Sequence, residues 1–206
     1  MTDPIVLLDI KDRIATVTLN DPDRRNPITG NNMIEAMLDV FDQVQRNPDV
    51  SVMVLTGAGS AFCAGGDIKA MHNKTDQFGL PPLDVAESYI NGIQRIPIAL
   101  YNLDVPTIAA VNGAAVGAGG DLDMVLEVVP HNDLMARARA KAAVIAAKPP
   151  RTVRTAKRLL RNAERMDLPD FLNTSAAYQA LMHQTGDHHE ALSAFLEKRQ
   201  PTYSGK

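Results

Sequence analysis

The chain has 206 residues and a net charge of −3, with 45% hydrophobic and 22% charged residues. This length suits a globular domain with a real buried core, and the composition is neither that of a disordered chain nor that of a fibrous one. The acidic balance argues against a nucleic-acid partner, because a general nucleic-acid binder carries a basic face. Cys63 is the only cysteine, which excludes an internal disulfide and CxxC-type zinc sites.

The sequence also argues against a membrane partner, since no apolar run approaches the roughly 20 residues of a membrane span. The N-terminal segment MTDPIVLLDIKDR carries acidic residues and lacks the basic region and apolar stretch of a secretory signal. We therefore expect a cytoplasmic protein.

The first part of the chain is predicted to alternate strands with a helix. Two β-rich runs, residues 5–10 and 14–20, are joined by a polar turn and predict a hairpin. A loop at 21–30 leads into an amphipathic helix predicted over 29–47. Residues 50–57 are apolar almost throughout, which predicts a short strand buried on both faces.

The middle of the chain is predicted to repeat this pattern. A loop over residues 58–69 precedes a helical stretch from about 84 to 102. Residues 105–113 predict a second buried strand, followed by a glycine-rich loop at 114–121. In residues 122–129 the spacing of apolar side chains favours a short helix, whereas the β-branched residues of its second half favour a strand; we prefer the helix.

Beyond Pro130 the pattern becomes entirely helical. Four successive helices are predicted, over residues 132–148, 151–166, 168–183 and 187–199. The basic side chains of the second are interpreted as a solvated face. We expect an α/β core over residues 1–130 and a C-terminal helical region over 131–206.

Each of the two buried strands is followed by a glycine-rich loop that ends in aspartate. The first loop is Cys63-Ala64-Gly65-Gly66-Asp67 and the second is Gly117-Ala118-Gly119-Gly120-Asp121. Glycine lets the backbone turn sharply and approach a ligand closely. Two such loops facing each other would supply two N–H donors to one oxygen, which is an oxyanion hole. Either loop alone, by its composition, is more typical of an ordinary strand-to-helix turn.

Four segments, taken in order along the chain, resemble the enoyl-CoA hydratase/isomerase (crotonase) family: ATVTLNDPDRRNPIT, SAFCAGGDIKAM, VPTIAAVNGAAVGAGGDLDM and AFLEKRQP. The likeness covers nearly the whole chain. It implies a crotonase-like spiral core of ββα-type units, followed by a C-terminal helical region that assembles subunits into trimers or dimers of trimers. It also implies a lyase or isomerase of fatty acid metabolism that acts on an acyl-CoA thioester. No metal or redox cofactor is implied, because coenzyme A arrives with the substrate.

The resemblance implies catalytic roles for three residues. Gly66 and Ala118 match the positions whose N–H groups hold the thioester carbonyl as it becomes an enolate. Asp121 falls where hydratases carry one of two glutamates, and its side chain is shorter by one methylene group, so that its placement matters. Asp121 also fits a residue at the start of a helix, where the helix dipole favours a negative charge.

Substrate-binding roles are implied for residues of the same two loops and for one residue outside them. These are Arg24, Ala64, Gly66, Asp67, Ile68, Lys69 and Ala118. Lys69 matches a position near the CoA phosphates, and Arg24 matches one that contacts the CoA nucleotide. Both cations fit solvated surface residues as well.

One block of the family pattern is missing. In the family the second loop opens a helix, and further elements follow that carry the second catalytic glutamate and part of the acyl pocket. Here GGDLDM runs directly into VLEVVP, which resembles a point several elements later. The sequence therefore predicts an internal deletion after Met124 and an enzyme of impaired activity. The alternatives are a non-catalytic acyl-CoA-binding or assembly subunit and a deletion product without a role of its own.

Overall fold

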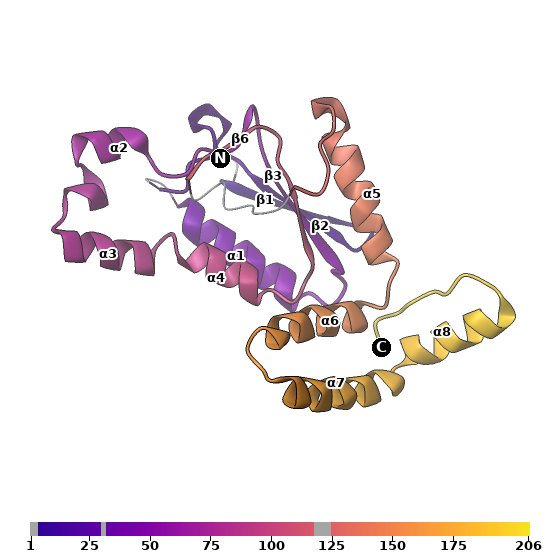
Figure 1. The fold of residues 1–206 in the computed structure, drawn as a ribbon. Helices are drawn as coiled ribbons and strands as arrows, with labels where there is room; N and C mark the ends of the chain where they lie inside the picture. The colour runs from indigo at the N-terminus through magenta and orange to yellow at the C-terminus, as the bar shows by residue number, and fades with distance from the viewer. Residues whose placement is uncertain (1–3, 30–31, 118–124) are drawn as a thin grey trace.

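The computed structural model describes residues 4–29, 32–117 and 125–206. Figure 1 shows a small twisted sheet with helices on both faces and a group of helices near the C-terminus beside it. None of the helices in these ranges is long and apolar enough to cross a membrane.

Four strands form the main sheet in the spatial order β1-β2-β3-β5. Their bounds are β1 Val6–Lys11, β2 Ile14–Leu19, β3 Val52–Gly57 and β5 Thr107–Ala110. Strands β1 and β2 are antiparallel, whereas β2, β3 and β5 run parallel to one another. A separate pair, β4 (Ala61–Cys63) and β6 (Ala114–Ala115), is also parallel.

The described helices follow the predicted order, except that one short helix was not predicted and one predicted helix is divided into two. Their bounds are α1 Met33–Arg46, α2 Ile68–Asn73, α3 Pro82–Asn91, α4 Arg95–Asn102, α5 Leu134–Ala146, α6 Pro150–Ala163, α7 Leu168–His183 and α8 Gly186–Glu197. Short 3-10 turns lie at Pro22–Arg24, Asp76–Gly79 and His131–Asp133. The four helices predicted beyond Pro130 are thereby confirmed.

The predicted hairpin is confirmed, and its turn has a clear stereochemical cause. Asp12 and Arg13 both have positive φ, at 52° and 66°. Two consecutive residues of this kind form the turn whose twist matches that of the flanking strands. The backbone of this turn therefore fixes the register in which Lys11 pairs with Ile14.

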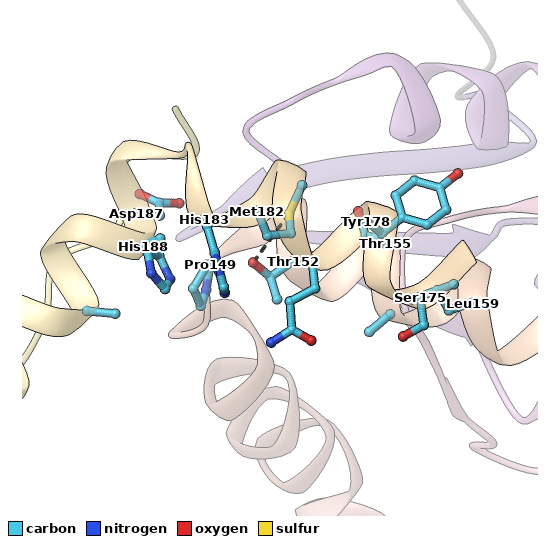
Figure 2. A pocket seen from close by; sticks show the side chains of 13 residues that line it. Pro149, Thr152, Thr155, Leu159, Ser175, Tyr178, Met182, His183, Asp187 and His188 are labelled. Carbon is cyan, nitrogen blue, oxygen red and sulfur yellow. Dashed lines mark hydrogen bonds between the residues drawn. The ribbon is translucent and has the colours of Figure 1, made fainter. Parts of the chain in front are cut away.

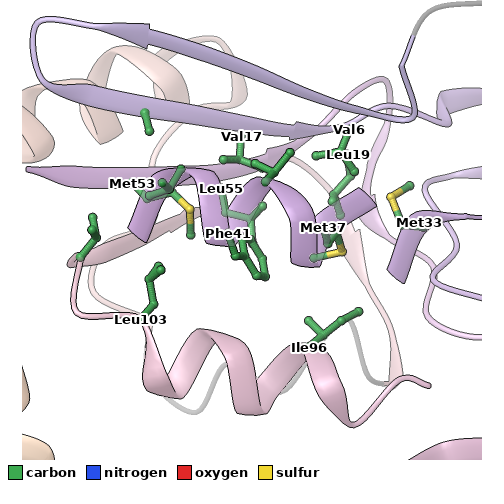
Figure 3. Close-up of a cluster of buried hydrophobic side chains, with 14 of the residues drawn as sticks. Val6, Val17, Leu19, Met33, Met37, Phe41, Met53, Leu55, Ile96 and Leu103 are labelled. Atoms are coloured by element: carbon green, nitrogen blue, oxygen red, sulfur yellow. The ribbon is translucent and has the colours of Figure 1, made fainter. Parts of the chain in front are cut away.

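Alternate side chains of the sheet supply two separate apolar layers. Val17, Met53 and Leu55 lie on the face covered by α1 and α4, where they meet Phe41 and Ile96 (Figure 3). Strand periodicity sends the intervening side chains of β3 to the opposite face, where they pack on α5. Because both faces are covered, every residue of β3 is buried, as its apolar sequence predicts.

Helix α5 lies close to the sheet because its inner stripe is made of alanines. Ala138, Ala142 and Ala146 recur every four residues and are all buried against Val52 and Val54 of β3. Helix α5 therefore packs on the sheet although it follows Pro130. The domain boundary at residue 130 stays a prediction.

Two predicted elements differ in the structure. The loop over residues 58–69 contains the strand β4, whose three residues are too few to show a period. The helix predicted over 84–102 is divided into α3 and α4, because Gly92 has φ −113° and ψ −107°, which no helix accommodates.

Residues 125–130 form neither helix nor strand, so the helix predicted over 122–129 is wrong for the part that the structure describes. Leu126 and Val128 are 83% and 88% exposed. An apolar face in the segment would have nothing to pack against, which removes the main source of stability for a short helix. The segment is held instead by Glu127, whose carboxylate pairs with two cations of α5 at 2.8 Å.

Helix α6 is joined to the core by its cationic side chains. Asp104, which follows α4 and is 5% exposed, accepts hydrogen bonds from Arg158 and Arg161. Arg154 donates to three main-chain carbonyl groups between the end of α1 and β3. Lys157 donates to the carbonyl next to Asp104 at 2.7 Å. The interpretation of this basic helix as a solvated face is therefore wrong for these side chains.

Candidate active site

The two glycine-rich loops follow β4 and β6, which are paired as parallel strands. Ala61 of β4 pairs with Ala114 of β6, and the carbonyl of Cys63 accepts the N–H of Val116 at 3.0 Å. Because parallel strands end at the same edge, both loops emerge there side by side. Gly117 is the last described residue of the second loop, and Ala118 and Asp121 lie outside the described residues.

The hydrogen bonds of the first loop leave one N–H group unused. Gly65 donates to Sγ of Cys63 at 3.4 Å, and Asp67 donates to Oγ1 of Thr29 at 2.8 Å. Between them, the N–H of Gly66 donates to no atom of residues 4–29, 32–117 or 125–206. Main-chain donors are nearly always paired in folded proteins, with protein, water or ligand. A donor of this kind, held between two fixed neighbours, is suited to an incoming oxygen.

The first loop can take this path because two glycines follow each other. Gly65 has φ +75°, a conformation that other residues adopt only with strain. A Cβ on Gly66 would lie 2.4 Å from the terminal methyl group of Met71. Met71 is 40% exposed, so this methyl group has room to move. Position 65 therefore needs glycine for its backbone, whereas position 66 is limited by a flexible neighbour.

Asp67 holds the end of the first loop to α2. Its carboxylate accepts the N–H groups of Lys69 and Ala70 at 2.9 and 3.1 Å, which is an N-cap. The bond from Ala70 contributes most to lowering the pKa of Asp67. The bond from Lys69 and the Arg24 guanidinium at 3.4 Å also hold this pKa below its usual range. Asp67 is therefore ionised at neutral pH and has a structural role.

The structure places both predicted cations near this loop. The guanidinium of Arg24 lies between the carboxylates of Asp67 and Asp21, at 3.4 and 3.6 Å. Lys69 is exposed on α2, which begins at Ile68 directly after the loop. Ala64 is also bonded to the segment that carries Arg24, because its N–H donates to the carbonyl of Arg25.

Two buried or half-buried asparagines near the loops were not predicted from the sequence. Asn26 is completely buried with φ +54°, and its Nδ2 donates to the carbonyl of Ala61 at 2.9 Å. Asn112 donates to the same carbonyl at 3.3 Å. The Asn-Gly pair that begins at Asn112 is a turn signal in the sequence, but its hydrogen-bond partners are distant in the chain.

Cys63 has no sign of nucleophilic activation. The thiol is buried, and burial raises the pKa of Cys63. The thiolate is the nucleophilic form, so a raised pKa makes the side chain less reactive. Cys63 therefore acts here as a small apolar residue and as an acceptor for Gly65.

A large apolar cavity of about 1530 Å³ adjoins the same strands. Phe62 and Cys63 of β4 line it, together with residues of α4, β5, α5 and α6 and of the segment 125–129. Strand β5 is the last strand of the main sheet on this side. The cavity therefore adjoins both Cys63, where the first loop begins, and the β5 edge of the sheet.

A second cavity, of about 420 Å³, lies among α6, α7 and α8 and away from the glycine loops (Figure 2). The imidazole rings of His183 and His188 stack beside it with their centres 4.5 Å apart. Among the described residues, no group of three or more His, Cys, Asp or Glu side chains is placed to hold a metal ion. Tyr178 and Ser175 give this cavity a partly polar wall.

Comparison with known proteins gives consistent matches along the chain. The family model described as enoyl-CoA hydratase/isomerase matches residues 9–126 and 121–206. A "Probable enoyl-CoA hydratase", EchA14, of Mycobacterium tuberculosis is 41% identical over 123 residues, which are 60% of this chain and 45% of that protein. The match thus spans less than half of that relative's length. The 1,2-epoxyphenylacetyl-CoA isomerase of Escherichia coli is 26% identical over 264 positions, covering 98% of each chain.

Solved structures share the fold. An enoyl-CoA hydratase from Bacillus anthracis superposes with a TM-score of 0.84 at 25% identity, covering 98% of this chain and 100% of that one. The E. coli alignment has more positions, 264, than the 206 residues of this chain, so part of that relative has no counterpart here. The two family-model matches meet at residues 121–126. With a family model that covers almost its entire length and an α/β core followed by C-terminal helices, the chain belongs to the enoyl-CoA hydratase/isomerase family.

Proposed function

We propose that the chain binds an acyl-CoA thioester and stabilises the enolate form of its carbonyl, as in the hydration or isomerisation of an enoyl-CoA. The observation that carries this proposal is the unused N–H of Gly66, fixed between two paired neighbours. Negative charge grows on the carbonyl oxygen as the α-carbon becomes nucleophilic. A positioned N–H donor at that oxygen contributes about 3–4 kcal/mol to catalysis.

The second donor in this proposal is the N–H of Ala118, and the acid/base group is Asp121. The parallel pairing of β4 and β6 supports this assignment, because it directs the second loop to the same edge as Gly66. In hydration, water oxygen bonds to the β-carbon while a proton is added at the α-carbon, so that one water is added across the double bond. Asp121 would transfer a proton in this exchange.

The remaining substrate contacts fit the two ends of an acyl-CoA. Lys69 is proposed to meet the CoA phosphates, since cations pair strongly with phosphate oxygens, and Arg24 is proposed to contact the CoA nucleotide. The acyl chain is proposed to pass from Gly66 into the cavity lined by Phe62 and Cys63, alongside the backbone of Ala64, Asp67 and Ile68. This chemistry adds water or moves protons and transfers no electrons to an acceptor, so that coenzyme A, entering with the substrate, is the one cofactor needed.

We propose that an internal deletion after Met124 has removed the second acid/base residue and lowered the rate. A positioned acid or base is worth about 10²–10⁴ in rate, whereas the N–H donors do not depend on it. The shortened alignment favours one alternative, a non-catalytic subunit that binds acyl-CoA. Binding and turnover separate these two functions.

Replacing Asp121 with alanine is expected to lower the rate of hydration by at least about 10²-fold, because the remaining acid/base group is lost. The measurement is the loss of ultraviolet absorbance as the conjugated enoyl thioester is consumed. Asp123→Ala, a carboxylate two positions away, is the matched control and is expected to keep the wild-type rate. Binding without turnover in the unaltered chain would support the non-catalytic subunit, and no binding would contradict both functions.

We also propose that copies of the chain associate through the C-terminal helices. Several of their large apolar side chains are at least half exposed, namely Leu168, Leu172, Leu181, Leu192, Phe195 and Leu196. Exposed apolar area of this kind marks an interaction surface. A trimer or a dimer of trimers is the expected state, measured by light scattering. The cytoplasmic location also stays a proposal.

A further inference from the structure

We infer that Asn112 is a positioning residue that sets the distance between β4 and β6, the strands that lead into the two glycine-rich loops. Its Oδ1 accepts the N–H of Gly57 at 3.1 Å. Its Nδ2 donates to the carbonyls of Gly59 and Ala61 at 3.0 and 3.3 Å. One side chain therefore satisfies groups at the end of β3, in the following turn and at the start of β4. The inference rests on the proposed function, because it gives a purpose to the spacing of the loops.

The location of Asn112 connects these bonds to the second loop. Asn112 is two residues before Ala114, which opens β6 and pairs with Ala61 of β4. The residue between Asn112 and Ala114 is Gly113, and there the backbone lies very close to the turn before β4. A Cβ on Gly113 would lie 2.1 Å from the carbonyl oxygen of Ser60. No side chain fits at position 113. The amide of Asn112 thus fixes β6 against the turn before β4 at their nearest approach.

Asn26 holds the same turn, but its side-chain hydrogen-bond partners belong to other segments than β6. Its Nδ2 donates to the carbonyls of Ala58 and Ala61, and its Oδ1 accepts the N–H of Asp21. Asn26 therefore ties the turn to the loop that follows β2. Asn112 alone of these two asparagines ties it to β6, the strand that leads into Gly117, and so controls how β6 lies relative to β4.

This position matters because two N–H donors must reach a single oxygen. An oxyanion donor acts at about 2.7–3.1 Å, and a shift of about 1 Å can cost roughly 10²-fold in rate. Strand β6 has only two residues, and its ladder with β4 is irregular between Ala61 and Cys63. So short a ladder cannot hold the spacing rigidly, and the Asn112 side chain supplies the additional contacts.

The test compares two ligands that differ only at the carbonyl. One is a saturated acyl-CoA thioester, and the other is the alkyl-CoA thioether, which lacks the carbonyl oxygen. In the unaltered chain the thioester is expected to bind about tenfold more tightly, the value of roughly one net hydrogen bond. In Asn112→Ala this preference is expected to fall to about one, while the Kd of the thioether changes by less than about threefold. Isothermal titration calorimetry gives both constants.

Two further variants make the result specific. Asn112→Asp keeps an acceptor for Gly57 but loses the donors to Gly59 and Ala61, and is also expected to lose the preference. It remains usable if the alanine variant does not fold. Asn20→Ala is the matched control, since Nδ2 of Asn20 donates at 2.9 Å to the carbonyl of Pro4, which belongs to neither loop. It is expected to keep the tenfold preference.

The possible outcomes are distinguishable. A general loss of structure would weaken both ligands together, so a change confined to the thioester supports the positioning role. Asn112 variants that keep the wild-type preference overturn it. If the unaltered chain shows no preference for the thioester, the proposed function fails first, and the role of Asn112 fails with it.

Discussion

Replacing Gly66 with proline is expected to lower kcat on an enoyl-CoA by about 10²- to 10³-fold, because proline has no N–H to donate to the developing oxyanion. The neighbouring amides cannot substitute, since Gly65 and Asp67 already donate to Cys63 and Thr29. If the donor acts mainly on the transition state, kcat falls while KM changes much less. Steady-state kinetics with an enoyl-CoA measures both constants.

Gly66→Ala is the matched control, because it keeps the N–H and adds only a methyl group. That methyl group meets the end of the Met71 side chain, which is flexible and part-exposed. We expect kcat to stay within about threefold of wild type, and thermal melting to show both variants folded. Equal activity of the proline and alanine variants would contradict the role assigned to the Gly66 amide.

The elements that were predictable from the sequence are those whose pattern of apolar and polar residues extends over several residues. Strand β3 is apolar throughout because helices cover both of its faces, and the hairpin of β1 and β2 has a polar turn between two β-rich runs. Strands β4 and β6 have three and two residues, too few for any period. They are nevertheless the strands that bring the two loops together.

Which N–H of the first loop is left without an acceptor among the described residues depends on contacts that the sequence does not show. Composition treats the glycines of the first loop alike, and the family resemblance alone singled out Gly66. In the structure Gly66 differs because Thr29, which lies far away in the chain, takes the next amide. The contacts of Asn26 and Asn112 are equally remote, with partners 35 and 51 residues away at Ala61.

The segment after the second loop shows a different limit. Its apolar spacing predicted a helix, yet residues 125–130 are irregular, and the side chains of Val125, Leu126 and Val128 are exposed. A helical pattern yields a helix only where its apolar face is buried. In this chain the cavity beside β5 lies next to the segment, and Val125 and Leu126 line it without filling it. A core shortened at this point would leave such a space.

The C-terminal helices illustrate how charge can be misjudged from composition. Asp104 and the cations of α6 are about 50 residues apart in sequence, so nothing local indicates that they meet. Their contacts nevertheless fasten α6 to the turn that precedes β5. Strand β5, which follows that turn, leads to Asn112 and the second loop. The stability of the helical region and the placement of the loop are therefore connected through Asp104.

Replacing Asp104 with asparagine is expected to lower the free energy of unfolding by about 2–3 kcal/mol. Loss of the carboxylate leaves Arg158 and Arg161 without their anionic partner in a place where Asp104 is 5% exposed. Removing one member of a buried ion pair costs about 3–5 kcal/mol, and the exposure of Arg158, 45%, reduces this. Urea denaturation at pH 7 measures the difference.

Asp42→Asn is the matched control for this variant, because Asp42 pairs with Arg46 on the exposed side of α1 at 2.8 Å. An exposed pair of this kind contributes about 0.5 kcal/mol or less. Equal loss of stability in the two variants would show that Asp104 is no more important than a surface carboxylate.

The pH dependence gives an independent check on Asp104. Burial favours the neutral acid, but the hydrogen bonds from Arg158 and Arg161 outweigh it and hold the pKa of Asp104 below its usual value. Unfolding returns this pKa to about 3.9, so the ion pair stabilises the fold fully above that pH and loses its effect as pH falls through the lower value of the folded state. The stability difference between wild type and Asp104→Asn is therefore expected to be constant from pH 7 to about 5 and to narrow below about pH 4. A difference that stays the same at acid pH would mean that the asparagine variant is destabilised by something other than the lost charge.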